Sequence, residues 1–457
     1  MAFLSKAKFG LSAGNLPFGI HYSWIIISIL ATVQVFASSI SMAAGIMVPP
    51  LNDAEGDFGW SLGTIGLVIA SYYLFGAMYA PITGWLGDRY GSRRMLLAAA
   101  TMYIVSMLLL SQVTAIWHFF VFFGILLSLT QSLAMVPLMA AVSGWFRRRL
   151  GVGVGLLWGA GGAGTAVMAP VIGGFIEAMG WQSTFMLIGA IGGGTMLCLV
   201  PFMRNKPADI GIQPYGARPA DAPMIVRDKT VDRLRQKVFN QHTRKTKPFW
   251  NLPLIHALGC AGHGTVLIYV IPMAIDRGAF SSLAQAGIIL TIIALISVIS
   301  RIVTPIMAEA YGTRKMMAAS LSIQAITVFM LFWSHDAWSF YLFAAIFGIG
   351  FGGEWTGYLV INRQYYGEGP MGTVYGWQTT GALMGHAVAT GLAGLVVYVT
   401  GSFNVVMAIS VGFSSLGVVV IGMLDDTSHV LIPNWEDDVP QLEAQTNPNL
   451  ETATADD

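Results

Sequence analysis

The segment Gly84-Trp85-Leu86-Gly87-Asp88-Arg89-Tyr90-Gly91-Ser92-Arg93-Arg94 decides the architecture, because part of it occurs twice in the chain. The six residues from Tyr90 read Tyr-Gly-Ser-Arg-Arg-Met, and the six from Tyr311 read Tyr-Gly-Thr-Arg-Lys-Met, an offset of 221 residues. A carboxylate precedes each copy, at Asp88 and at Glu309. Because the offset is close to half of the 457-residue chain, the repeat predicts two related halves, an architecture of many membrane carriers.

The composition identifies lipid as the solvent of this chain. Hydrophobic residues make up 55% of it and charged residues only 10%, whereas soluble domains are roughly a quarter charged. Cys198 and Cys260 both lie in apolar runs, without the spacing of a disulfide framework or a metal site. The first apolar run, 22–48, is too long for a cleavable signal sequence. We interpret it as the first spanning helix.

Twelve apolar runs are long enough to cross the bilayer, which requires roughly 20 residues each. They cover residues 22–48, 61–87, 94–113, 115–142, 150–176, 183–203, 250–274, 283–308, 315–334, 337–361, 373–399 and 403–424. We predict an all-α membrane protein with twelve transmembrane helices in two pseudo-symmetric six-helix bundles. The expected domains are an N-terminal bundle, a central cytoplasmic loop, a C-terminal bundle and an acidic cytoplasmic tail whose end is disordered: 1–203, 204–248, 249–424 and 425–457.

The distribution of basic residues predicts the orientation. With a cytoplasmic N-terminus, 22 of the 24 Lys and Arg residues fall in cytoplasmic segments or at their borders, and only Arg277 lies outside. Such an asymmetry follows the positive-inside rule. We therefore expect a multi-pass protein of the plasma membrane (a bacterial inner membrane), with both termini cytoplasmic.

The segment 84–94 closely resembles the signature that joins helices two and three in the major facilitator superfamily. The resemblance implies that Asp88, Arg89 and Arg93 act in a cytoplasmic gate. Glu309 and Arg314 hold the matching positions in the second copy. The alternative is a solvated turn that carries only positive-inside charges.

A second resemblance narrows the family. The segment 145–149, Trp-Phe-Arg-Arg-Arg, and the alternating glycines that follow in 151–155 resemble the helix 4–5 motif of monocarboxylate carriers and bacterial oxalate/formate antiporters. The fragments 58–61, Phe-Gly-Trp-Ser, and 207–211, Pro-Ala-Asp-Ile-Gly, support this branch. It implies a small organic anion as substrate.

Two charged residues lie deep in predicted spans, Arg301 and Glu354. The helical rise places each about 13 Å from the cytoplasmic border, where an unpartnered charge costs several kcal/mol. The family resemblance implies that Arg301 grips the carboxylate of the substrate. Its alternative role is a structural ion pair with Glu354. The sequence departs from the family at Ser297, where proton-linked relatives have an aspartate, and at 381–383, where antiporters have a lysine.

Glu354 is the candidate for proton coupling, since an anion arriving at Arg301 would compete for that cation and favour protonation of Glu354. Its alternative role is a fixed counter-ion. His263 and His386 fall about one helical turn above this pair, roughly 20 Å from the cytoplasmic border. They could donate to an anion or relay protons, although a histidine bonded to backbone is equally ordinary. Further candidates for substrate binding could equally pack between helices: Tyr269, Gln131, Tyr358 and Trp377.

We therefore predict a secondary active transporter of a small organic anion, a monocarboxylate, that works by proton-coupled symport with alternating access. The alternatives are an organic anion antiporter, an exporter of amphipathic compounds and a sensor without flux. The sequence has no nucleotide-binding loop, metal-ligand cluster or nucleophile motif. We expect no enzyme activity, no cofactor, no metal and no nucleic-acid partner, and a monomer whose partners are the carboxylate, protons and the lipid bilayer.

Overall fold

The computed structural model describes residues 20–439 except 53–57, 222 and 225. Over these residues the chain forms helices and no β-strand. The helices are α1 (Tyr22–Asn52), α2 (Leu62–Tyr90), α3 (Ser92–Leu110), α4 (Ile116–Phe119), the π-helix η1 (Phe120–Leu127), α5 (Ser128–Trp145), α6 (Leu150–Leu199), the 3-10 helix η2 (Pro207–Ile210), α7 (Lys229–Thr243), α8 (Lys247–Asp276), α9 (Leu283–Tyr311), α10 (Thr313–Met330), α11 (Ala337–Glu354), α12 (Gly357–Tyr366), α13 (Gly372–Thr400), α14 (Phe403–Gly422) and the 3-10 helix η3 (Trp435–Asp437).

These helices confirm the predicted fold of twelve crossings in two six-helix groups. Four crossings are not separate regular helices. The fourth runs through α4, η1 and α5, and the tenth is divided into α11 and α12. The fifth and sixth are both contained in α6, which turns at Gly180, where φ is +79° and ψ 162°. Glycine adopts this conformation without the strain that a side chain would cause.

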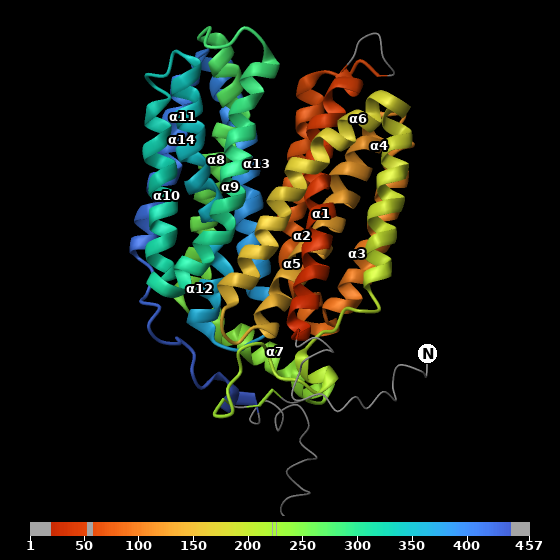
Figure 1. The fold of residues 1–457 in the computed structure, drawn as a ribbon, viewed down its shortest axis with the longest axis vertical. Helices are drawn as coiled ribbons and strands as arrows, with labels where there is room; N and C mark the ends of the chain where they lie inside the picture. The colour runs from red at the N-terminus through yellow and green to blue at the C-terminus, as the bar shows by residue number, and fades with distance from the viewer. Residues whose placement is uncertain (1–19, 53–57, 222, 225, 440–457) are drawn as a thin grey trace, which may run out of the picture.

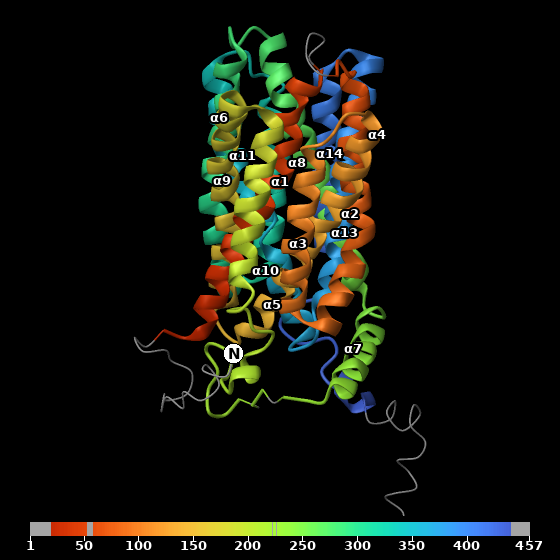
Figure 2. The same ribbon diagram turned by 90° about the vertical axis from the view of Figure 1, so that its right-hand side faces the viewer.

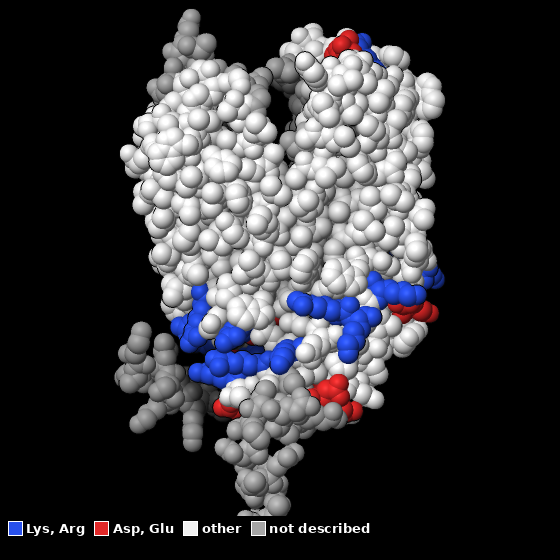
Figure 3. Space-filling model, turned by 180° about the vertical axis from the view of Figure 1, so that it is seen from behind, with Lys and Arg blue, Asp and Glu red and all other residues white. Residues whose placement is uncertain are grey.

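The two halves separate at one end of the molecule and meet at the other. Figure 1 shows α1–α6 on one side and α8–α14 on the other, converging above α7. Figure 3 shows a cleft between the halves at the open end and a band of Lys and Arg around the closed one. We call the closed, Lys- and Arg-rich end the basic end.

The outer surface of the bundle suits a lipid environment. Large apolar side chains are exposed along the helices, and exposed aromatic residues lie near both ends of the spans, as in the aromatic belts of membrane proteins. At the basic end these are Trp85, Tyr90, Trp250 and Tyr311, and at the opposite end Trp117, Trp333, Trp338 and Tyr398. The multi-pass membrane class therefore agrees with the exposed surface as well as with helix length.

Glycines allow the halves to touch at the basic end, and they do so twice. A Cβ on Gly84 of α2 would lie 2.1 Å from the Gly372 carbonyl of α13, and a Cβ on Gly372 would lie 2.4 Å from the Gly84 carbonyl. A Cβ on Gly151 of α6 would lie 2.3 Å from the Pro305 carbonyl of α9. Any side chain at these positions would push the helices apart. Because 151 and 372 are one repeat offset apart, the two contacts are related by the duplication.

The central segment contains more structure than the predicted loop. Asp228 is the N-cap of α7, and its side chain accepts a hydrogen bond from the Thr230 N–H. The helix α7 lies across the basic end (Figure 2). Its Phe239 is buried against Trp435 of η3, with ring centroids 5.0 Å apart. The first part of the acidic tail therefore packs on the central segment. The predicted disorder concerns the end of the tail, which lies outside the described residues.

Candidate functional site

The tenth crossing breaks beside its only acidic residue. α11 ends at Glu354, a turn covers Trp355 and Thr356, and α12 begins at Gly357. The Thr356 N–H bonds the Gly353 carbonyl at 3.3 Å, three residues back. In carriers, discontinuous spanning helices commonly form the binding site, because the break frees polar groups toward the cavity. The sequence analysis placed Glu354 inside a continuous span and did not predict this break.

Glu354 is fully buried, and polar groups of Tyr358 and His263 lie beside its two oxygens. The Tyr358 hydroxyl donates to Glu354 Oε1 at 2.9 Å, from one turn further along the chain. His263 Nδ1 of α8 lies 3.5 Å from Glu354 Oε2, and both side chains are completely buried. A buried carboxyl group between a hydroxyl and an imidazole has partners for either protonation state. The arrangement therefore allows a proton to be held or passed at this point.

The two predicted histidines meet in space. The ring centroids of His263 and His386, on α8 and α13, lie 5.2 Å apart. His386 stacks on Tyr73 of α2 at 5.3 Å, across the boundary between the halves. Trp355 stacks on the same imidazole at 5.8 Å. The histidines thus form one wall shared by α8, α13 and the break in the tenth crossing.

Cys260 lies beside the same histidines, although its position in the sequence did not indicate a metal site. The donor atoms of Cys260, His263 and His386 all lie within 4.8 Å of one another, as do those of His256, Cys260 and Glu354. Sulfur and imidazole ligands in this number could hold a transition metal. We assign none. The spacing His256-x3-Cys260-x2-His263 on one helical face was the signal available in the sequence, but His386 joins only through the tertiary fold.

Arg301 lies beside this cluster and forms no ion pair with a described residue. Its guanidinium carbon is 5.4 Å from the ring centroid of Phe351. A Cβ on Gly162 of α6 would lie 3.6 Å from Arg301 Nη1, so the side chain reaches the first half. Arg301 Nε is buried without a hydrogen-bond partner. Nε is therefore available to an anion. Glu354 accepts from Tyr358 and lies 3.5 Å from His263, and it interacts with Arg301 through charge without forming a salt bridge.

The remaining predicted binding residues have contacts outside this cluster. Trp377 packs against Phe249 and Trp250 near the basic end, more than two helical turns before His386 on α13. The ring of Tyr269 is tilted against that of Phe403, with centroids 6.4 Å apart. Gln131 on α5 donates to Met135. Of the seven predicted binding residues, the structure gathers Arg301, His263, His386 and Tyr358 around Glu354.

Asp88 joins the two halves at the basic end. Its carboxylate accepts from the backbone N–H groups of Gly372 and Thr373, both at 2.8 Å, and from the Thr373 hydroxyl at 3.0 Å. These groups form the first turn of α13, where the helix dipole favours a negative charge. At the repeated position, Glu309 faces the backbone N–H groups of Leu150 and Gly151 at the start of α6. Each half therefore caps a helix of the other.

A third contact lies between these two, and the sequence analysis did not identify it. Arg147 donates to Glu368 through Nε at 2.7 Å and through Nη2 at 2.6 Å. Arg363 also donates to Glu368, at 2.6 Å. Burial alone would raise the pKa of Glu368, but the hydrogen bonds and charges of Arg147 and Arg363 outweigh it and hold the pKa below its ordinary value. Arg147 and Glu368 are themselves 221 residues apart, so the repeat brings its own equivalent positions into contact.

The other predicted gate residues act within one half. The Arg93 backbone N–H donates to Asn205 and its Nε to the Val200 carbonyl. Arg314 donates to the Gly422 carbonyl. Arg89 lies over the rings of Trp85 and Tyr90. In the described residues, Asp88 and Glu309 are therefore the members of the predicted set that contact the opposite half.

The fold, the duplicated halves and a polar site between them define a membrane transporter. The family described as Major Facilitator Superfamily matches the chain over residues 30–308 and 264–446. The protein belongs to this superfamily, which confirms the recognition made from the segment 84–94.

Similar proteins are transporters for several small molecules. The probable nitrate/nitrite transporter NarK2 of Mycobacterium tuberculosis is 26% identical over 333 residues, covering 71% of this chain and 78% of that protein. The riboflavin transporter RibJ of Trypanosoma cruzi is 30% identical over 116 residues, 24% of either chain. Monocarboxylate transporter 11 of Mus musculus is 21% identical over 174 residues, 37% of either chain. They agree on transport and differ in what is carried.

Proposed function

We propose that the protein is a secondary active transporter of a small organic anion, a monocarboxylate, driven by proton symport. The observation that carries this proposal is Arg301, a permanently charged group among apolar spans that has no ion-pair partner in the described residues. A guanidinium can fork onto the two oxygens of a carboxylate. A bound anion would supply a counter-charge in direct contact with the guanidinium, at a depth where charge is costly.

Glu354 supports proton coupling. It lies in the same buried region as Arg301 without pairing to it, and its polar neighbours are Tyr358 and His263. In the proposed cycle the proton binds Glu354 as the anion binds Arg301, so that the loaded site is neutral overall. A neutral site crosses the apolar interior at a lower cost than a charged one.

The observed conformation fits one stage of alternating access. The halves are joined at the basic end through Asp88, Glu309 and the Arg147–Glu368 pair, and they are separated at the opposite end. We propose that the basic end is cytoplasmic, with both termini on that side of a plasma membrane. The structure then represents an outward-open state whose cytoplasmic gate is closed.

This orientation can be tested with single-cysteine variants. A cysteine at Lys229 should resist an impermeant thiol reagent added to intact cells, because α7 lies at the basic end. A cysteine at Asn52, at the end of α1, should react. Labelling of Lys229→Cys from outside would reverse the orientation and with it the assignment of the gate.

The transport proposal requires a reconstituted assay. Purified protein in liposomes should accumulate a labelled monocarboxylate such as lactate or formate when the solution on the open-cleft side of the membrane is the more acidic one. Unlabelled carboxylates should compete, whereas zwitterions and cations should not. Nitrate provides the discriminating competitor, since NarK2 is described as a nitrate/nitrite transporter. If the protein accumulates nitrate but no carboxylate, the proposed substrate class is wrong, and only the proposal of an anion-binding site remains.

A further inference from the structure

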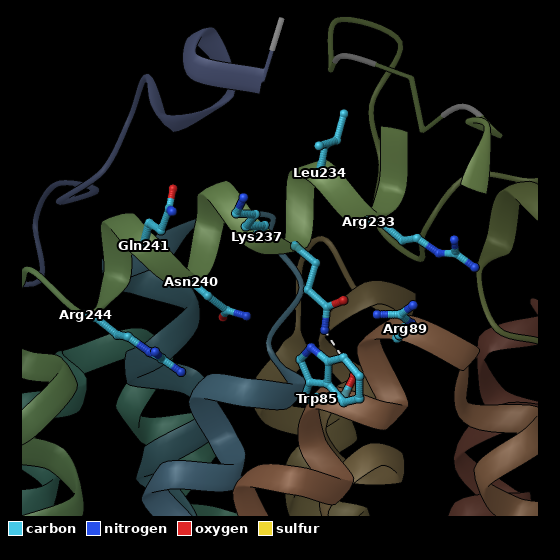
Figure 4. Close-up of a pocket in the computed structure, with 9 residues that line it drawn as sticks. Trp85, Arg89, Arg233, Leu234, Lys237, Asn240, Gln241 and Arg244 are labelled. Carbon is cyan, nitrogen blue, oxygen red and sulfur yellow. Dashed lines mark hydrogen bonds between the residues drawn. The ribbon is translucent and has the colours of Figure 1, made fainter. Parts of the chain in front are cut away.

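A basic cavity lies at the basic end, between α7 and the end of α2 (Figure 4). Its volume is about 570 Å³. The residues that line it are Trp85, Arg89, Arg233, Leu234, Gln236, Lys237, Asn240, Gln241 and Arg244. Four of them are cations and none is an acid. The chemistry of the lining therefore calls for an anion.

The cations of this cavity have no acidic partner among the described residues, unlike several of the cations around them. Arg235, on the same helix, pairs with Glu436 at 2.6 Å and lies 4.8 Å above the ring of Trp435. Elsewhere at this end Arg147, Arg148, Lys206 and Arg363 also have acidic partners. The side chains of Arg233, Lys237 and Arg244 form no ion pair with a described residue. Their repulsion would be relieved by a bound anion.

An apolar path leads from the cavity along the outside of the bundle. On α2, Leu74, Met78, Ile82 and Trp85 are exposed by 45%, 58%, 54% and 38%. Their spacing places them on one face of the helix, and the face ends at the cavity. Trp250 of α8 is exposed by 55% at the same end, as expected at the boundary between hydrocarbon and headgroups. An anion with acyl chains would bind the basic cavity with its headgroup and cover the apolar face of α2 with its chains. A soluble anion would bind the cavity only.

The cavity is connected to the contact that holds the halves together. Gln236 of α7 donates to the Trp85 carbonyl at 3.0 Å, and Asn240 donates to the Thr373 hydroxyl at 3.2 Å. That same hydroxyl donates to Asp88 at 3.0 Å. Arg89 comes from the first half, whereas α7 leads directly into α8 of the second half. A ligand held by Arg89 and α7 together would therefore join the halves.

We propose that this cavity binds the headgroup of an anionic phospholipid, with its acyl chains along the exposed face of α2. The bound lipid fixes α7 over α2 and α13 and thereby stabilises the closed basic end. The binding site stands independently of the transported substrate, and its effect on conformation rests on the proposed alternating access.

Lipid binding can be measured directly by native mass spectrometry of the full chain. Phosphatidylglycerol, phosphatidylcholine and inorganic phosphate are the three probes. The pocket variant is Arg233→Gln, Lys237→Gln and Arg244→Gln combined, with Arg89 left in place because it belongs to the proposed gate segment. The control variant is Arg227→Gln, Lys229→Gln and Lys245→Gln, which removes the same charge from the same segment without touching the cavity.

The expected result is retention of phosphatidylglycerol by the unchanged protein and the control, and roughly tenfold or more weaker binding by the pocket variant, since each basic residue near a membrane surface contributes on the order of 1 kcal/mol. Equal losses in both variants would overturn the site, because they would reduce it to general surface charge. Equal retention of phosphatidylcholine, or displacement of the lipid by inorganic phosphate at similar concentration, would also overturn it.

The conformational arm uses nitroxide labels at Arg94→Cys and Lys315→Cys, at the starts of α3 and α10, with Cys198 and Cys260 replaced by alanine. In nanodiscs, adding phosphatidylglycerol to phosphatidylcholine should increase the population with the short distance in the control but not in the pocket variant. An unchanged distance distribution in the control, with lipid binding intact, would overturn the stabilising role.

Discussion

The two halves of the molecule share an architecture but not the chemistry at their centres. With the repeat offset of 221 residues, Arg301 corresponds to Ala80 and Glu354 to Leu133. Ala80 and Leu133 are both apolar and buried. The first half instead contributes Tyr73 and Gly162, which contact His386 and Arg301. One half therefore carries the charged groups, and the other supplies the wall that closes on them.

At the basic end the halves contribute equally. Asp88 caps α13 and Glu309 faces the start of α6, while Arg147 and Glu368 are repeat equivalents that touch each other. The duplication has thus been retained where the halves must fit together. It has diverged at the buried centre, where Arg301 and Glu354 lie in the second half only. We expect mutations at the centre to have strongly unequal effects in the two halves, and mutations at the basic end to have similar effects in both.

The largest effect is expected at Arg301. Arg301→Ala should reduce transport by roughly a hundredfold or more, because truncating one partner of a buried charge pair costs about 2–5 kcal/mol. Arg301→Lys keeps the charge and loses the fork, so a loss of about tenfold is expected. Uptake into proteoliposomes measures both, at matched protein yield. Near-normal uptake by Arg301→Ala would leave the residue a structural role only.

Glu354→Gln should separate coupling from transport. A permanently neutral side chain mimics the protonated site, so pH-driven accumulation should disappear while exchange of labelled for unlabelled anion continues. Leu133→Met, at the repeat-equivalent position, conserves volume and should retain both activities. Counterflow and uptake in the same liposomes provide the measurement. Retained accumulation by Glu354→Gln would exclude Glu354 as the coupling residue and direct attention to His263 and His386.

The contacts at the basic end should respond more mildly and in parallel. Asp88→Asn and Glu309→Gln each remove a negative charge from a helix N-terminus, which contributes about 0.3–2 kcal/mol. Each should therefore raise the proportion of molecules open at the basic end by up to roughly thirtyfold, Asp88 more than Glu309 because Thr373 adds a third bond. Thiol accessibility of an introduced cysteine at Thr380 would report it. An effect confined to one variant would show that closure is asymmetric.

The smallest effect is a pH dependence of the Arg147–Glu368 contact. The pKa of Glu368 is lowered in the closed state despite burial, because Arg147 and Arg363 favour the carboxylate. A lowered pKa stabilises the closed state above the ordinary glutamate pKa of about 4.3, and this contribution is lost as the pH falls through the lowered value. The contribution of Glu368 to closure should thus be constant between about pH 6 and 8 and decline below about pH 4.

Glu368→Gln is the control for this titration. It should remove the pH-dependent component and behave at neutral pH as the unchanged protein does in acid. The same nitroxide pair at the starts of α3 and α10 reports the distance. A pH response of equal size in Glu368→Gln would assign the titration to another carboxylate, with Asp88 the next to be examined.

The sequence by itself determined the class, the number of crossings and the two-half plan. These depend on composition, on the length of apolar runs and on a repeat, which can all be recognised in the sequence. The bilayer fixes the length of a spanning helix and requires its backbone groups to be paired internally. It also indicated Asp88 and Glu309, since both stand at the same place in the repeated segment.

Only the tertiary structure decided which polar groups meet. His386 reaches Cys260 and His263 from another helix, and Arg147 reaches Glu368 from the opposite half. Helix rise gives the depth of a residue but not its rotation about the helix axis or its neighbours. For that reason Trp377 could be placed near the site by sequence and yet pack against Phe249 and Trp250. The break after Glu354 and the packing of α7 likewise follow from contacts between distant segments, which no local pattern contains.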